Sequence, residues 1–222
     1  MSARALITLV LGTALIGGVA ARAPRPHPPL RGSGPLAIPG VRERIELDGE
    51  LVETPWLSAA RTGAFLAPRT PESSRPYSDA RFLHDADNLY VALYAADQDM
   101  RRGTDAFLLA FLDPRDGSTL ALSISVDKQV REKRVRNGVD SAWESGIRFA
   151  VDSDGTLDDA SDEDEEWIVE AAIPLASLGV TPATSELRAS IARCDTPKDS
   201  VTRCGAWGVA RDGGIGGALM LR

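Results

Sequence analysis

The sequence predicts an all-β protein, an antiparallel β-sandwich of the jelly-roll or immunoglobulin-like kind with about nine or ten strands. Short segments in which polar and apolar residues alternate recur along most of the chain, and turn signals such as Asp48-Gly49 and Asp113–Gly117 separate them. No stretch has the spacing of a long amphipathic helix, and no internal repeat is evident. The pattern therefore favours two packed sheets over a helical or parallel α/β fold.

The strongest predicted strand is Asn88–Ala96, in which tyrosine and aliphatic side chains follow a turn at Asp85–Asn88. Two further predicted strands flank the Asp113–Gly117 turn, and another pair flanks an acidic loop. In chain order we predict strands at Arg42–Leu47, Ala80–Leu83, Asn88–Ala96, Asp105–Leu112, Thr119–Val126, Ile147–Val151, Trp167–Ile173, Leu187–Arg193, Ala206–Ala210 and Ala218–Leu221.

Residues 162–179 predict a strand, the end of that strand and a short helical turn after it. After an acidic run, Trp167, Val169 and Ala171 fall on one side of a strand, and the residues between them fall on the other. Pro174 cannot donate a ladder hydrogen bond, so the strand must end or turn there. A short helical turn that stops at Gly179 is expected to follow.

The predicted core takes the large apolar residues from the inward positions of these strands and from the turns beside them. Burying each such side chain contributes about 1.5–3 kcal/mol, which is enough for one domain of this length. The predicted core residues are Leu47, Trp56, Leu89, Val91, Leu93, Phe107, Leu109, Phe111, Leu122, Ile124, Trp167, Val169, Ile173, Leu178, Leu187, Ile191 and Trp207.

The N-terminal part of the chain is typical of an exported protein. Residues 1–21 combine Arg4, an apolar run and small residues around Ala21, which predicts a signal peptide cleaved after Ala21. Residues 22–40 contain six prolines and are predicted to be a linker, so the domain spans residues 41–222. We expect a secreted or periplasmic protein. The alternative is a protein anchored in the membrane by an uncleaved N-terminal segment.

Cys194 and Cys204 are the only cysteines of the chain. They lie at the ends of two strands that are predicted to be neighbours, and an exported chain meets an oxidising compartment. We therefore predict a disulfide, which would be worth about 2–3 kcal/mol in the loop-entropy model. The alternative is a pair of buried thiols.

Composition and motifs argue against several classes of function. The net charge of −7 disfavours nucleic-acid binding, which selects basic surfaces. Of the two histidines, His27 lies in the predicted linker and His84 lies at a strand end beside Asp85, where a lone histidine is more often a surface residue than a catalytic base. No nucleophile elbow, phosphate loop or paired-histidine metal motif occurs. We therefore expect a protein that is not catalytic by itself.

Carboxylates are the candidate metal ligands, since hard cations select oxygen. Asp97 and Asp99 directly follow the strongest predicted strand and are the preferred candidates for a structural calcium site. Nine of the fifteen residues from 152 to 166 are also acidic, but a solvated loop is the favoured explanation of that run and calcium is the alternative.

Sugar recognition requires an aromatic platform beside hydrogen-bonding groups, because sugar rings present an apolar face and hydroxyls. Of the four tryptophans, Trp207 is the best candidate platform, with Arg193, Arg211 and Asp212 as polar partners. A place in the core nevertheless remains the favoured expectation for Trp207, as it is for Trp167.

Four segments, in this order, resemble the family 9 carbohydrate-binding modules and their DOMON-related superfamily. They are Ile45–Trp56 ("LDG" before a tryptophan), Leu83–Asp97 ("D.NLYVA"), Asp105–Pro114, and Glu166–Pro174 ("W.VEAAIP"). The resemblance covers about residues 41–222 and implies an antiparallel sandwich, often stabilised by calcium. Haem-binding relatives exist, but we do not expect haem bound through His84 or Met100.

The resemblance also implies binding of sugar-chain ends between two tryptophans, often beside glycoside hydrolases. This chain departs from that pattern, because 100–105 has no aromatic residue and the position of a binding glutamate falls on Leu108 or Leu109. We expect a partner among polysaccharides or cell-envelope glycans, linked to polysaccharide breakdown. One alternative is an envelope scaffold or interaction domain that has lost sugar binding, and a less favoured one is a glycoside hydrolase.

Overall fold

The computed structural model of the chain describes residues 34–67, 70, 72–198, 201–210 and 212–221. The predicted signal peptide and most of the predicted linker lie outside these residues. Secondary structure in the described part consists of thirteen strands and one short 3-10 helix, η1 (Thr54–Ser58). The strands are β1 (Leu36–Ile38), β2 (Ala60–Arg61), β3 (Ser78–His84), β4 (Asn88–Ala96), β5 (Ala106–Leu112), β6 (Thr119–Ser125), β7 (Val130–Arg136), β8 (Val139–Ser141), β9 (Arg148–Asp154), β10 (Glu166–Pro174), β11 (Glu186–Asp195), β12 (Arg203–Trp207) and β13 (Gly217–Leu221).

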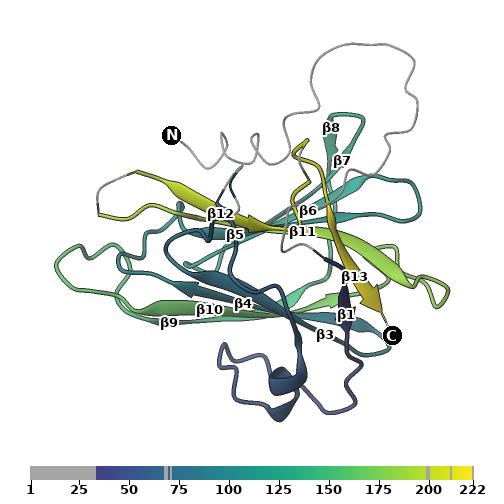
Figure 1. Ribbon diagram of the computed structural model, residues 1–222, viewed down its shortest axis with the longest axis horizontal. Helices are drawn as coiled ribbons and strands as arrows, with labels where there is room; N and C mark the ends of the chain where they lie inside the picture. Colours follow the sequence, from purple (N-terminus) through teal and green to yellow (C-terminus); the bar gives the residue numbers. More distant parts are fainter. Residues whose placement is uncertain (1–33, 68–69, 71, 199–200, 211, 222) are drawn as a thin grey trace.

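The strands form two sheets that lie face to face, as the upper and lower layers of Figure 1 show. The eight-stranded sheet has the order β1-β13-β11-β5-β6-β7-β8, and β12 pairs with β11 in addition. The five-stranded sheet has the order β2-β3-β4-β10-β9. All strand pairs are antiparallel except β1 with β13. The predicted antiparallel β-sandwich is therefore confirmed.

The main core lies between the two sheets and is built by strand alternation. On β10, Trp167, Val169 and Ala171 face the core, where β4 places aliphatic residues at the paired positions. Every predicted core residue is buried except Leu47, which is half-buried. Phe107 packs at the centre, with its ring centroid 4.9 Å from that of Trp167 and 6.3 Å from that of Phe65. The alternation that predicted the strands thus also predicted which of their faces is inside.

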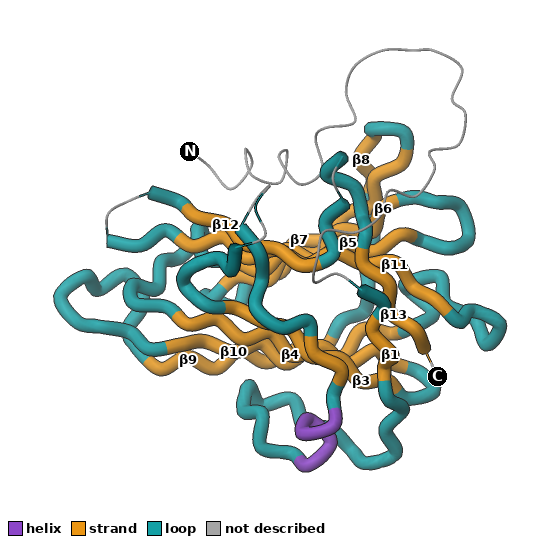
Figure 2. Tube along the Cα trace, viewed as in Figure 1, coloured by secondary structure: helices purple, strands orange, loops and turns teal. Residues whose placement is uncertain are grey.

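A second, smaller apolar cluster lies on the outer face of the five-stranded sheet. The segment 41–59, which includes η1, crosses this face; Figure 2 shows the helix in purple below the sheet. Ile45 and Trp56 from this segment pack on Leu83, Tyr90 and Ala172 of the sheet. Covering one end of the face in this way hides apolar side chains that would otherwise meet water.

Glu170 fastens this segment to the sheet. Its carboxylate is fully buried and accepts hydrogen bonds from the Trp56 indole N–H (2.7 Å), the Gly49 amide (2.9 Å) and the Asp48 amide (3.1 Å). Gly49 has a φ of +96°, and a Cβ there would lie 2.6 Å from the backbone nitrogen of Asp152. The "LDG", tryptophan and "VEAAIP" motifs therefore meet at one structural contact, which we call the Glu170 clasp.

The structure corrects the sequence reading at three places. Arg42–Leu47 is not a strand; its apolar residues rest on the sheet face instead of pairing at an edge. The sheet begins at Leu36, inside the segment predicted as linker, and Ile38 is fully buried. The highly charged β7 was not predicted, since arginine, lysine and glutamate hide its alternation.

The described residues contain no helix with the length and apolarity that a membrane crossing requires.

Candidate functional site

The residues predicted to bind sugar do not gather at one exposed face. Trp207 is only 3% exposed and packs in the main core, with its ring centroid 6.0 Å from that of Phe82. A Cβ on Gly217 would lie 2.5 Å from the Trp207 ring, so β13 covers it closely. Asp212 lies in an exposed turn, and Arg211 is outside the described residues. Trp207 is thus a core residue in this structure, and its ring has no free face for a sugar.

Arg193 is also buried, and it links the two sheets. From β11 its guanidinium donates to the Ala96 carbonyl (2.7 Å) and the Ser78 hydroxyl (3.3 Å) of the opposite sheet. It also bridges Asp97 (2.7 Å) and Asp195 (2.9 Å). A guanidinium with four fixed acceptors is a structural cross-link, and it cannot reach a ligand at the surface.

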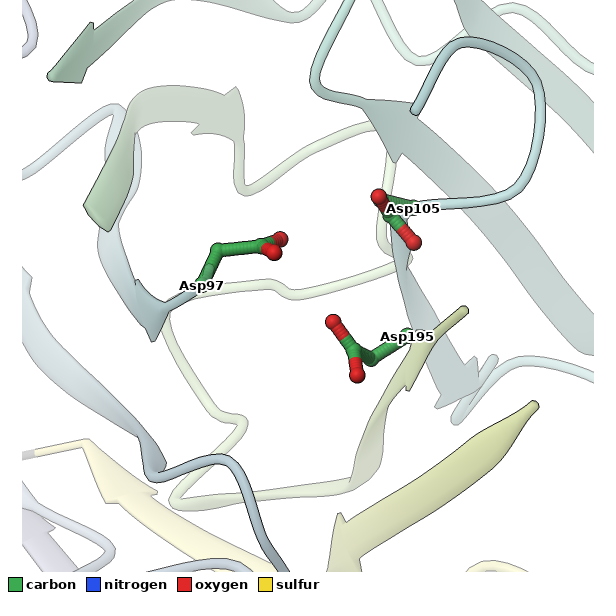
Figure 3. A group of neighbouring side chains, drawn as sticks. All are labelled: Asp97, Asp105 and Asp195. Atoms are coloured by element: carbon green, nitrogen blue, oxygen red, sulfur yellow. The ribbon is translucent and has the colours of Figure 1, made fainter. Parts of the chain in front are cut away.

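Beside Arg193, the ends of β4, β5 and β11 bring Asp97, Asp105 and Asp195 together. Figure 3 shows that their carboxylates point toward one another. One oxygen of each lies within 4.8 Å of the others, and none of the three residues is more than 3% exposed. The Trp167 indole N–H also donates to Asp97 (3.2 Å). Sequence reasoning identified Asp97 and Arg193 singly, but it could not place Asp105 and Asp195 beside them.

The carboxylates in this cluster outnumber the single guanidinium, and their pKa values reflect that. Burial raises the pKa of Asp105 to about 7, helped by the charge of Asp97 and opposed by amide hydrogen bonds from Arg101 and Thr196. Burial also raises the pKa of Asp195 to about 6, although Arg193 opposes the rise. The cluster therefore holds a proton near neutral pH more readily than a free aspartate would.

The resemblance implies a structural calcium, and the donor set here does not fit one. Calcium takes six to eight oxygen ligands. Asp97 and Asp195 already accept from Arg193, and both oxygens of Asp105 accept backbone amides, so only Asp195 Oδ2 lacks a partner among the described residues. Asp99, the other predicted ligand, pairs with Arg101 at 2.6 Å. Arginine side chains supply the positive charge that a cation would bring.

The predicted disulfide is confirmed. Cys194 of β11 and Cys204 of β12 are paired directly across an antiparallel ladder, with their Cα atoms 4.2 Å apart, and they are bonded to each other. The bridge closes the hairpin whose first strand carries Arg193 and Asp195, so it holds one wall of the carboxylate cluster in place.

The tryptophan clamp that the resemblance implies has no counterpart in the expected place. Leu109 faces the core, and Leu108 lies on the outer face of the eight-stranded sheet. Its cross-strand neighbours there are Ser123 and Ala192. Trp56 and Trp167 are buried, and Trp143 is half-buried against the core. None of the tryptophans that the structure describes has a strongly exposed ring.

The comparisons with known proteins agree on one fold. A family 9 carbohydrate-binding module from Caldicellulosiruptor kristjanssonii, in complex with cellotriose, superposes with a TM-score of 0.57 and 13% identity, covering 84% of this chain and 93% of that one. The module from the same organism in complex with glucose gives a TM-score of 0.57 and 13% identity over 85% and 95%. A protein from Bacteroides uniformis ATCC 8492, proposed to bind carbohydrate, gives 0.58 and 10% over 85% and 99%.

No protein-family model matches the sequence, and no curated protein matches it. At 10–13% identity the structural likeness shows the fold alone. It confirms that the chain has a fold like that of the family 9 modules, as the four motifs indicated.

Proposed function

We propose that this chain, whose domain has the fold of the family 9 carbohydrate-binding modules, is an exported protein that binds a polysaccharide or a cell-envelope glycan and is not catalytic by itself. The observation that carries the proposal is the superposition, over most of both chains, on modules in complex with cellotriose and with glucose. The composition of residues 1–21 supports export to a place where such glycans occur.

The chemistry of the described residues agrees with a binding role. The converging carboxylates of Asp97, Asp105 and Asp195 are sealed from solvent and neutralised in part by Arg193, so they have no access to a glycosidic bond. A link to polysaccharide breakdown would then come from a partner enzyme that acts on the same polymer.

Binding is tested with the purified full chain by affinity electrophoresis against xylan, β-glucan and cell-wall preparations, and by calorimetry with cellotriose. Retarded migration in at least one polysaccharide is the expected result. No binding to any of these probes would refute the function. Release of reducing sugar by the pure protein would show a hydrolase instead.

A scaffold or interaction domain of the cell envelope is the second candidate, and one observation favours it. The position where the resemblance places a binding glutamate carries Leu108, and none of the tryptophans that the structure describes is strongly exposed. Co-purification with an envelope complex by a protein that binds no glycan would support this candidate.

A further inference from the structure

The segment 41–59 leaves one end of the outer face of the five-stranded sheet uncovered. Tyrosine, arginine and aspartate side chains lie together at this end. Asp79 and Arg81 alternate outward on β3, and Tyr94 of β4 lies directly across from Asp79. Arg61 of β2 lies across from Arg81. Tyr77, just before β3, is 43% exposed and is the one aromatic among the strongly exposed large apolar residues that the structure describes. We call this surface the Tyr77 face.

The Tyr77 ring is fixed although it is exposed. Its hydroxyl donates to Asp79 Oδ2 at 2.8 Å, and the ring packs edge to face on Tyr94 with the centroids 5.9 Å apart. The pKa of Tyr77 is raised by burial and by the hydrogen bond to Asp79, so the hydroxyl remains a donor at physiological pH. A ring held at its tip and along one edge loses little further freedom when a ligand stacks on it.

Hydrogen-bonding groups surround this ring. Arg61 donates to the same Asp79 oxygen at 2.7 Å while its side chain stays 53% exposed, so other N–H groups of its guanidinium are available to a ligand. Asp79 itself is 1% exposed, and its Oδ1 atom has no hydrogen-bond partner among the described residues. The same is true of the buried Nε of Arg81. These two atoms are shielded from solvent, so the groups within reach of a ligand are the Tyr77 ring and the exposed part of the Arg61 guanidinium.

The charge of the face selects the class of ligand. The positive charges of Arg61 and Arg81 are offset by Asp79 and Glu166, and Asp154 of β9 lies directly across from Glu166 on the same face. Burial, together with a hydrogen bond to Glu166, raises the pKa of Tyr94 to about 12. A face without an excess of positive charge gives no advantage to an acidic sugar or to a phosphate. It suits a neutral sugar ring, whose apolar side stacks on an aromatic ring while its hydroxyls both donate and accept.

We propose that the Tyr77 face is a sugar-binding site of this chain, in which one neutral pyranose unit of a polysaccharide stacks on Tyr77 and Arg61 donates to its hydroxyls. Asp79 is the positioning residue that holds both side chains. Because Tyr94 meets Tyr77 edge to face at 60°, the two rings do not form a flat double platform, and a single sugar unit is the expected contact. This inference rests on the proposed function. It places sugar binding on the five-stranded sheet, whereas Trp207 lies in the eight-stranded sheet.

The experiment measures the affinity of full-chain variants for the polysaccharide that the wild type binds, and for cellotriose. Tyr77→Ala is expected to weaken binding about tenfold or more, as loss of a central aromatic anchor does. Tyr77→Phe keeps the ring and is expected to stay within about threefold of the wild type, since only the anchoring hydroxyl is lost. Arg61→Met is expected to lower the affinity several-fold. Leu57→Ala, which truncates a residue that is 87% exposed outside this face, is the matched control.

The outcomes separate the site from the function. If Tyr77→Ala and Arg61→Met bind as the wild type does, the site is elsewhere and the proposed function still stands. If the wild type binds none of the probes, both proposals fail. An equal loss in Tyr77→Phe and Tyr77→Ala would also overturn the stacking contact. Thermal unfolding of each variant shows whether it is folded, and Arg61→Met keeps the test decisive if Tyr77→Ala does not fold.

Discussion

The Glu170 clasp predicts that the stability of this domain depends on pH in a particular direction. Burial raises the pKa of Glu170 from 4.5 to about 7, against the opposing effect of its three N–H donors. The folded protein therefore keeps a proton between pH 4.5 and 7 that the unfolded chain has released. A folded-state pKa above the unfolded value gives an acid a stabilising contribution that is complete at low pH and is lost as the pH rises through this window.

The magnitude follows from the two pKa values. The pKa of Glu170 is 4.5 in the unfolded chain and about 7 in the folded protein. Because of this difference, Glu170 alone should lower the free energy of unfolding by about 2–3 kcal/mol between pH 5 and pH 8. Glu170→Gln removes the titration and retains the shape of the side chain. The wild type should therefore lose about 2–3 kcal/mol relative to Glu170→Gln over this interval, which corresponds to roughly 5–10 °C in Tm for a domain of this size.

Urea denaturation, followed by tryptophan fluorescence, gives the free energy of unfolding of the wild type and of Glu170→Gln at pH 5 and at pH 8. The double difference is the change between the two pH values in the wild type minus the same change in the variant. The control is Glu50→Gln, which removes one exposed carboxylate from the same N-terminal segment and against which the result for Glu170→Gln is compared. A double difference for Glu170→Gln that is near zero or of opposite sign would refute the reasoning. It would mean that the three N–H donors outweigh burial and keep the carboxylate ionised at pH 5.

Three further predictions concern the scaffold. Gly49→Ala should lower the free energy of unfolding by about 2–4 kcal/mol, because the positive φ is strained for alanine and the new Cβ would meet Asp152. Gly63→Ala is the control: its φ is +70° but its Cβ would lie in open space, so it should cost only about 1 kcal/mol. Equal losses in urea titrations would show that the close approach of residue 49 to Asp152 contributes nothing. Cys204→Ser opens a bridge between positions ten residues apart and should lower stability by about 2–3 kcal/mol in non-reducing buffer, with no further loss on adding dithiothreitol. Trp56→Phe removes the indole donor to the clasp and should cost about 1.5–3 kcal/mol at pH 7, and a loss below 0.5 kcal/mol would show that water replaces it.

The sequence predicted the sandwich because burial on one side of a strand leaves an alternation that can be read without a structure. Asn88–Ala96 and the strand at Trp167 show this most clearly, and their core faces were predicted residue by residue. The same rule missed β7, where arginine, lysine and glutamate occupy inward and outward positions alike. It also predicted a strand at Arg42–Leu47, where the alternation comes from packing on a sheet face and not from pairing within a sheet.

The functional residues were harder to predict for a physical reason. Alternation gives the two sides of a strand, but it does not tell whether an isolated aromatic residue beside charged neighbours is inside, and Trp207 is inside. Tyr77 gives no signal in the sequence, since it follows a proline outside the predicted strands and gains its partners only through the fold. The carboxylate cluster joins Asp97 with Asp195, and only the packing of the two sheets brings positions so far apart in the chain together.

The motifs that carry the family resemblance are the ones that hold the sandwich together, so they predict the fold without locating a ligand. Glu170, Trp56 and Gly49 form a contact on which the cover of one sheet depends, and their side chains are buried. A ligand site needs the opposite property, since its side chains must stay exposed and keep hydrogen-bonding capacity. Buried contacts restrict substitution far more than surface positions do, so a sequence can keep the scaffold of a fold while its exposed faces change. The Tyr77 face is where the second requirement is met.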